Sequence, residues 1–168
     1  NSLDMGFSYN PGAAKGIATE PLLTEGLFLV GATGVDDPGE KVSFSEVGKR
    51  SLILPSRGFG LREWVESTAR DREMALDIAF EIDSVATQRE LVEGGLGYTI
   101  LPYAAVRQAV EANRLFAAQI IRPHISRTLN IAYAASHSEN KATRAVRAVI
   151  DRVVAESVAE SNGRLQKA

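Results

Sequence analysis

The regular alternation of short apolar segments with segments of helical periodicity most constrains how this chain can fold. The strand-like segments are almost continuously apolar and are bounded by Gly, Pro, Asp or Ser; they lie at residues 3–7, 27–32, 51–55, 78–82, 98–102, 116–121 and 129–135. Strands that are apolar on both sides are typical of parallel or mixed sheets with both faces covered. We therefore predict an α/β fold.

Four segments between these strands are predicted to be helical. They lie at residues 61–73, 84–93, 103–112 and 141–161. The first carries Leu61, Trp64, Val65 and Thr68 on one face. The last is predicted to begin after Asn140 as its cap and to bury an apolar stripe made of Ala142, Ala145, Val146, Val149 and Val153. Residues 9–12 read as a turn, and the polar, Gly/Pro-rich stretch 34–50 reads as a linker or surface loop.

Composition excludes several classes of function. The formal net charge of −2 provides no basic surface for nucleic acid. The absence of cysteine rules out disulfides, thiolate metal ligands and a thiol nucleophile. No apolar run approaches the ~18 residues that a membrane span requires, and the N-terminal residues do not resemble a signal peptide. We expect a cytoplasmic protein without membrane contact, and we interpret the abrupt start of the sequence as a piece of a longer chain.

Three glycines mark the joint between a predicted helix and a predicted strand in ELVEGGLGYTILP, residues 90–102. Gly94 or Gly95 can adopt the left-handed conformation that ends a helix. Gly97 allows another segment to approach the backbone closely. Because phosphate-binding glycines follow a strand and open a helix, the reverse order here indicates a tight turn rather than a dinucleotide site.

Two strand-to-helix joints are better candidates for binding. In LPSRGFGLR, residues 54–62, Ser56 offers a hydroxyl and Arg57 a bidentate fork near a helix start that favours anions. The alternative is that Ser56 caps the helix and Arg57 is a solvated charge. In EIDSVAT, residues 81–87, Ser84 and Thr87 can present donors to the same edge, or Ser84 can act as a cap only.

Catalytic and metal-binding patterns are not indicated. His124 and His137 have no partner at ligand spacing, and Ser136, His137 and Glu139 are only neighbours in sequence. The GxSxG, P-loop and HExxH patterns are missing. We therefore predict no enzyme activity, no metal and no cofactor.

The order of several stretches resembles the effector-binding domain of LysR-type transcriptional regulators, in the branch that includes nitrogen-assimilation regulators. They are PLLTEGLFLVG, VSFSEVGKRSLILPSRGFGLR, FEIDSVATQRELVEGGLGYTILPYAAV and ISRTLNIAYAASHSENKATRAVRAVI. The resemblance implies a two-lobed fold like that of type II periplasmic binding proteins, with an effector cleft between the lobes. It also implies a homo-oligomer, dimer or tetramer, that contacts DNA only through an N-terminal helix-turn-helix absent here.

Placed on this sequence, the resemblance divides the chain into two lobes. Lobe one comprises residues 1–42 and 129–168, and lobe two comprises residues 51–121; the chain crosses between them at 43–50 and 122–128. The opening strand–helix units of lobe one are absent, so lobe one is expected to be incomplete, with Tyr9 to Pro11 as its only guessed ligand residues.

The resemblance assigns a cleft-lining role to three residue pairs. They are Ser56 and Arg57, Ser84 and Val85, and Tyr98 and Thr99. The implied function is effector sensing and oligomerisation for a bacterial regulator, with a small, anionic metabolite closing the lobes. The alternatives are a periplasmic solute-binding protein of a transporter, which needs an export signal, and an enzyme on the same scaffold, which needs an acid–base pair that we do not find.

Overall fold

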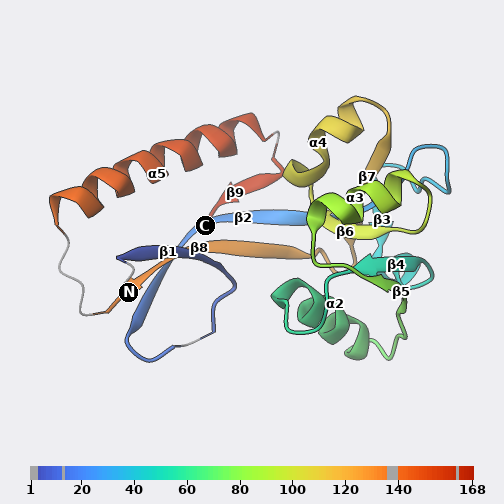
Figure 1. Cartoon of the computed structure of the whole chain (residues 1–168), viewed down its shortest axis with the longest axis horizontal. Helices are drawn as coiled ribbons and strands as arrows, with labels where there is room; N and C mark the ends of the chain where they lie inside the picture. Colours follow the sequence, from blue (N-terminus) through green and yellow to red (C-terminus); the bar gives the residue numbers. More distant parts are fainter. Residues whose placement is uncertain (1–3, 13, 136–139, 162) are drawn as a thin grey trace. The chain divides into compact units, whose positions relative to one another are not determined.

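The computed structural model describes residues 4–12, 14–135, 140–161 and 163–168 and shows a mixed α/β protein (Figure 1). It separates into two compact units. Unit 1 comprises Asn1–Glu25 and Ser126–Ala168, and unit 2 comprises Gly26–Ile125. The first boundary differs from the crossing expected at residues 43–50, because that stretch lies inside unit 2.

Unit 1 is built on strands β1 (Met5–Tyr9), β8 (Ser126–Ala134), the first part of β2 (Ile17–Ala32) and β9 (Leu165–Lys167). They lie in the order β1-β8-β2-β9, and the pairs β1–β8 and β2–β9 are antiparallel. Helix α5 (Lys141–Glu160) contributes to the core of this unit. Buried in that core are Leu22, Leu23, Ile131 and Val154.

Helix α5 begins where the sequence predicts but buries a different face. Asn140 caps it through a reciprocal capping box with Thr143. The predicted apolar stripe is wrong: Val146, Val149 and Val153 are each about half exposed, at 49–50%. The face that packs against the core instead carries Ile150, Val154 and Val158, which are spaced four residues apart. Valines occupy two faces of this helix, so periodicity alone could not choose between them.

Unit 2 contains two sets of paired strands. The second part of β2 pairs antiparallel with β6 (Thr99–Pro102) and β7 (Leu115–Ile121), and β3 (Lys41–Ser43) pairs parallel with β7. Strands β4 (Ser51–Leu54) and β5 (Asp77–Glu81) pair parallel with each other, and a bridge from Leu52 to Tyr98 joins β4 to the start of β6. The helices of this unit are α1 (Phe44–Val47), α2 (Gly60–Arg70), α3 (Val85–Glu93) and α4 (Tyr103–Glu111).

Both faces of the unit 2 sheet are covered, as predicted. Leu27 and Leu29 of β2 belong to one buried cluster with residues of α1 and α2. Phe28 and Val30, on the other face, belong to a second cluster with residues of α3 and α4. Alternate residues of a strand point to opposite faces, so an apolar run of this kind requires cover on both sides.

The structure corrects several of the predicted segments. Residues 34–50 are not only a loop, because they contain β3 and α1, whose Val42, Phe44 and Val47 are buried. Helix α2 ends at Arg70 rather than at residue 73. Strand β2 starts at Ile17, ten residues earlier than the predicted strand, and β9 was not predicted. In the missed strands the local pattern is polar or very short, and pairing with distant strands decides the structure.

The glycine joint is a tight helix-to-strand turn. Gly94 occupies the C-cap position of α3 with φ −75°, and Gly95 takes the left-handed conformation with φ +75°. Gly97 has φ +151°, and a Cβ atom there would lie 2.8 Å from the Ser51 carbonyl oxygen. These glycines allow the chain to turn and to pass directly against β4.

Candidate ligand-binding site

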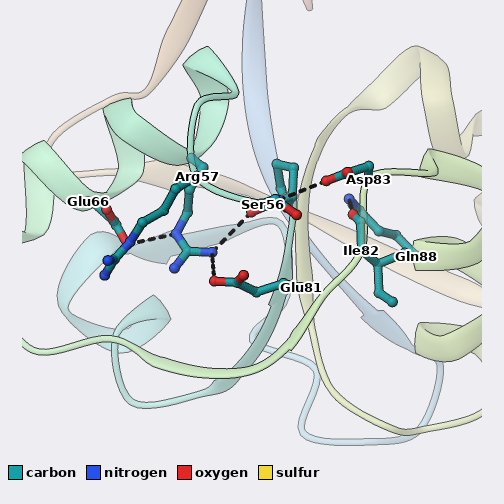
Figure 2. Close-up of polar contacts among 9 residues, drawn as sticks. Ser56, Arg57, Glu66, Glu81, Ile82, Asp83 and Gln88 are labelled. Carbon is teal, nitrogen blue, oxygen red and sulfur yellow. Dashed lines mark hydrogen bonds and ion pairs between the residues drawn. The ribbon is translucent and has the colours of Figure 1, made fainter.

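The carboxyl ends of β4 and β5 lie side by side in unit 2. Because the two strands are parallel, the residues that follow them meet at one edge of the sheet. The Ser56 amide donates to Asp83 Oδ1 at 2.9 Å (Figure 2). The Ile82 amide donates to the Leu54 carbonyl at 2.9 Å. We call this edge, defined by Ser56, Asp83, Ser84 and Val85, the strand-end site.

Ser84 and Val85 open helix α3 at this edge. The Ser84 hydroxyl accepts a hydrogen bond from the Thr87 amide at 3.3 Å, so the predicted capping role of Ser84 is confirmed. Both residues are exposed. The start of a helix carries amides without intrahelical partners and the positive end of the macrodipole, which together favour an anion.

Ser56 and Arg57 lie between β4 and α2. The cap position of α2 is Phe59, without a side-chain cap hydrogen bond, so the alternative in which Ser56 caps this helix is wrong. The Arg57 side chain is 79% exposed, and its Nε lies 3.6 Å from Glu66 Oε1. Figure 2 shows Arg57 directed toward Glu66, whereas Ser56 faces Asp83. An exposed ion pair of this length contributes little to stability.

Tyr98 and Thr99 point in different directions because they are neighbours in an extended segment. Thr99 is fully buried, and its hydroxyl donates to Gln88 Oε1 at 2.9 Å; Gln88 Nε2 then donates to the Ile82 carbonyl at 2.6 Å. Thr99 therefore reaches the strand-end site only through Gln88. The Tyr98 ring lies against Arg50, 4.7 Å from its Cζ atom, and belongs to the opposite core cluster.

Sequence reasoning missed Arg62, whose side chain is only 3% exposed. Its Nε donates to Glu66 Oε1 at 2.8 Å, and its Nη1 lies 3.0 Å from the Pro55 carbonyl and 3.1 Å from Glu81 Oε1. The hydrogen bond from Arg62 is the main cause that lowers the pKa of the Glu66 carboxyl below its usual value. An arginine at the spacing of Val65 and Ala69, on the inward face of α2, was the available signal.

A groove of about 570 Å³ runs between α2 and β5, within the size range of small-molecule sites. Its lining combines three arginines and two glutamates with apolar side chains of α2, of β5 and of the loop between them. The lining residues are Arg57, Arg62, Glu66, Ala69, Arg70, Met74, Leu76, Ile78 and Glu81. Arg57 and Arg62 therefore border both the groove and the loop that carries Ser56.

Unit 1 has a polar cluster of its own around Tyr9. The Arg127 guanidinium lies over the Tyr9 ring, and Arg127 Nε donates to Glu25 Oε1 at 2.6 Å. Burial raises the pKa of the Tyr9 hydroxyl, against the opposing effect of Arg127. Of the residues guessed for lobe one, Tyr9 thus contacts the Arg127–Glu25 ion pair of its own unit.

In the ranges that the structure describes, no three His, Asp or Glu side chains gather as metal ligands. His124 contacts Gln119, with 3.2 Å between Nε2 atoms. Ser136, His137 and Glu139 lie outside the described residues. None of the described helices has the length and apolar character needed to cross a membrane.

Solved structures establish the fold. The Synechocystis CcmR regulatory domain in complex with 2-PG superposes with a TM-score of 0.77 at 17% identity, over 90% of this chain and 73% of that chain. Reduced OxyR from N. meningitidis gives a TM-score of 0.78 at 22% identity, over 99% of this chain and 74% of that chain. The effector-binding domain of QuiR in complex with shikimate gives a TM-score of 0.75 at 18% identity, over 91% of this chain and 72% of that chain. The fold is that of LysR regulatory domains, which is periplasmic-binding-protein-like.

The sequence comparison defines the family. A family model described as the LysR substrate binding domain matches residues 1–155, so the chain belongs to this family. The nitrogen assimilation regulatory protein nac of Klebsiella aerogenes is 32% identical over 148 residues, covering 88% of this chain and 48% of the relative. The protein of the same name from Escherichia coli K12 is 29% identical over 160 residues, covering 95% of this chain and 52% of the relative. The chain thus spans about half the length of these two transcriptional regulators.

Proposed function

We propose that the chain is the effector-sensing and oligomerisation domain of a bacterial LysR-type transcriptional regulator. The observation that carries a ligand role for unit 2 is the strand-end site, where the Ser56–Asp83 hydrogen bond joins the end of β4 to the start of α3. DNA contact then belongs to a helix-turn-helix outside this chain, and the domain acts as a cytoplasmic dimer or tetramer without catalytic turnover.

The ligand that fits this edge is a small anion that also carries a hydrogen-bond donor. The amides at the start of α3 attract a carboxylate or phosphate. Arg57 can join them, because leaving its long, exposed contact with Glu66 requires little free energy. The neighbouring Asp83 carboxylate repels a bare anion but accepts a hydrogen bond from a hydroxyl or amine of the ligand.

Two neighbours with named ligands support the anionic part of this chemistry, and one of them also supports the hydrogen-bond donor. CcmR was solved with 2-PG and QuiR with shikimate, and shikimate is a carboxylate that bears hydroxyl groups. The alternative of a solute-binding protein of a transporter is not favoured, because the sequence relatives named above are transcriptional regulators.

The test is a calorimetric titration of the 168-residue chain with 2-phosphoglycolate, shikimate and inorganic phosphate, each in a separate experiment. We expect Arg57→Ala to lower the affinity for the probe that binds by about tenfold, as for the loss of one charge-assisted contact. The unfolding midpoint should not change. Arg107→Ala, which removes another exposed arginine on α4, is the matched control. An unchanged affinity in Arg57→Ala would show that Arg57 does not hold the anion.

A further inference from the structure

We propose that Arg62 is the positioning residue of the strand-end site, an inference that rests on the proposed function of that site. Arg62 does not reach the ligand, because its side chain is almost completely buried. It acts instead through the two chain segments that it holds, one after β4 and one at the end of β5.

The partners of Arg62 come from three separate elements. Its Nη1 contacts the Pro55 carbonyl at 3.0 Å and the Glu81 carboxylate at 3.1 Å, while its Nε contacts Glu66 on α2 at 2.8 Å. Pro55 immediately precedes Ser56, and Glu81 lies two residues before Asp83. One guanidinium therefore ties together the two segments whose next polar groups form the Ser56–Asp83 hydrogen bond.

The consequence for binding is geometric. The separation between Ser56 and the start of α3 is set by how the β4 and β5 ends lie against each other. Without Arg62 that separation depends on the Ser56–Asp83 hydrogen bond, which is exposed, and on the backbone ladder. A ligand that must contact both sides loses affinity when they separate, because its contacts require a preorganised arrangement.

Only an arginine satisfies this arrangement. Its planar group presents Nε and Nη donors in fixed directions, so it can serve two carboxylates and a carbonyl at once. A lysine keeps the positive charge but has one nitrogen at the end of a flexible chain. Arg62→Lys therefore separates the loss of the fixed geometry from the loss of the charge.

Two variants test the inference in the full 168-residue chain. Arg62→Lys keeps the charge, and Glu81→Gln removes only the Glu81 charge, at a side chain that is 51% exposed. The readouts are affinity for shikimate, 2-phosphoglycolate and inorganic phosphate, and hydrogen exchange of the Ser56 amide. We expect about tenfold weaker binding in Arg62→Lys, on the scale seen when supporting contacts of a binding site are removed. We expect faster Ser56 exchange in both variants, and Arg107→Lys should change neither readout.

The outcomes separate this inference from the proposed function. If the wild-type chain binds a probe and Arg62→Lys binds it equally well, the positioning role is overturned while the site stands. If affinity and thermal stability fall together with no change in Ser56 exchange, Arg62 is only structural and the inference is also overturned. If the wild-type chain binds none of these three probes, the proposed function fails first and the role of Arg62 in binding fails with it.

Discussion

The guanidinium of Arg127 lies over the ring of Tyr9, with 3.7 Å between the Arg127 Cζ atom and the ring centroid. The same guanidinium donates to Glu25, whose side chain is only 8% exposed. Arg127 thus satisfies a buried carboxylate of β2 and covers an aromatic ring of β1 at once. A buried carboxylate that loses its partner is much less favourable than an intact pair.

Arg127→Ala is expected to destabilise the chain by about 3 kcal/mol, because it leaves the Glu25 carboxylate buried and unpaired. Urea denaturation monitored by circular dichroism measures the change. The double variant Arg127→Ala with Glu25→Gln should recover part of the loss, since the buried charge is gone. Tyr9→Leu, which removes the stacking together with the hydroxyl that interacts with Glu25 and Arg127, should lower the unfolding free energy by about 1 kcal/mol. If the double variant is no more stable than Arg127→Ala, the buried charge is not the cause.

Gly97→Ala is expected to be strongly destabilising, by about 3 kcal/mol or more, because the new Cβ atom would meet the Ser51 carbonyl oxygen at a strained φ. Gly94→Ala provides the matched comparison. Gly94 has a negative φ, and its Cβ atom would make only ordinary contacts of 3.4 Å or more. We expect a change within about 1 kcal/mol there. Equal unfolding midpoints for the two variants would contradict the close approach of this joint to β4.

The two faces of α5 should respond differently to truncation. Val154→Ala removes buried methyl groups from the core of unit 1 and should lower the unfolding free energy by about 2 kcal/mol. Val149→Ala, on the half-exposed face, should change it by less than about 0.5 kcal/mol. Thermal unfolding of both variants at one pH gives the comparison. A larger effect at Val149 would show that the buried face of α5 is the one predicted from the sequence.

Acid should weaken unit 1 through Glu20. Hydrogen bonds from Tyr133 first, and from Arg147, lower the pKa of the Glu20 carboxyl below its usual 4.5. A carboxyl with a lowered folded-state pKa contributes stability above its unfolded pKa and loses it as the pH falls through the folded value. Unfolding free energies measured from about pH 6 to about pH 3 should therefore decline less steeply for Glu20→Gln. Glu160→Gln, at the end of α5, the helix that carries Arg147, is the control and should follow the wild-type curve.

Several elements could be predicted because their signals are local. Strand β4, helix α3 and strand β6 combine apolar runs with Ser84 as a cap and glycines as a stop, all within a few residues. Strand β9 has no such signal, because its three residues are extended only by pairing with residues 23–25 of β2. The first half of β2 is likewise defined by its neighbours, because Pro21 and the polar residues around it give no strand pattern in the sequence.

The candidate site shows the same division. The cap formed by Ser84 spans three residues and is readable from the sequence. The role of Arg62 is not readable, because its partners Pro55 and Glu81 become neighbours only when β4 and β5 pair. The assignment of Tyr98 and Thr99 to the cleft stays a prediction, and the structure connects only Thr99, through Gln88, to the strand-end site.

Unit 2 closes on itself, because the Leu27 amide donates to the Ile125 carbonyl at 2.8 Å, near its two ends. It is also uninterrupted in sequence, whereas unit 1 is assembled from both ends of the chain. A gene fragment for residues 26–125 should therefore yield an autonomous module, and its adjacent ends make it a candidate for circular permutation or for insertion into a host protein. A dispersed amide spectrum of that fragment would establish its autonomy, whereas a collapsed spectrum would show that it depends on unit 1.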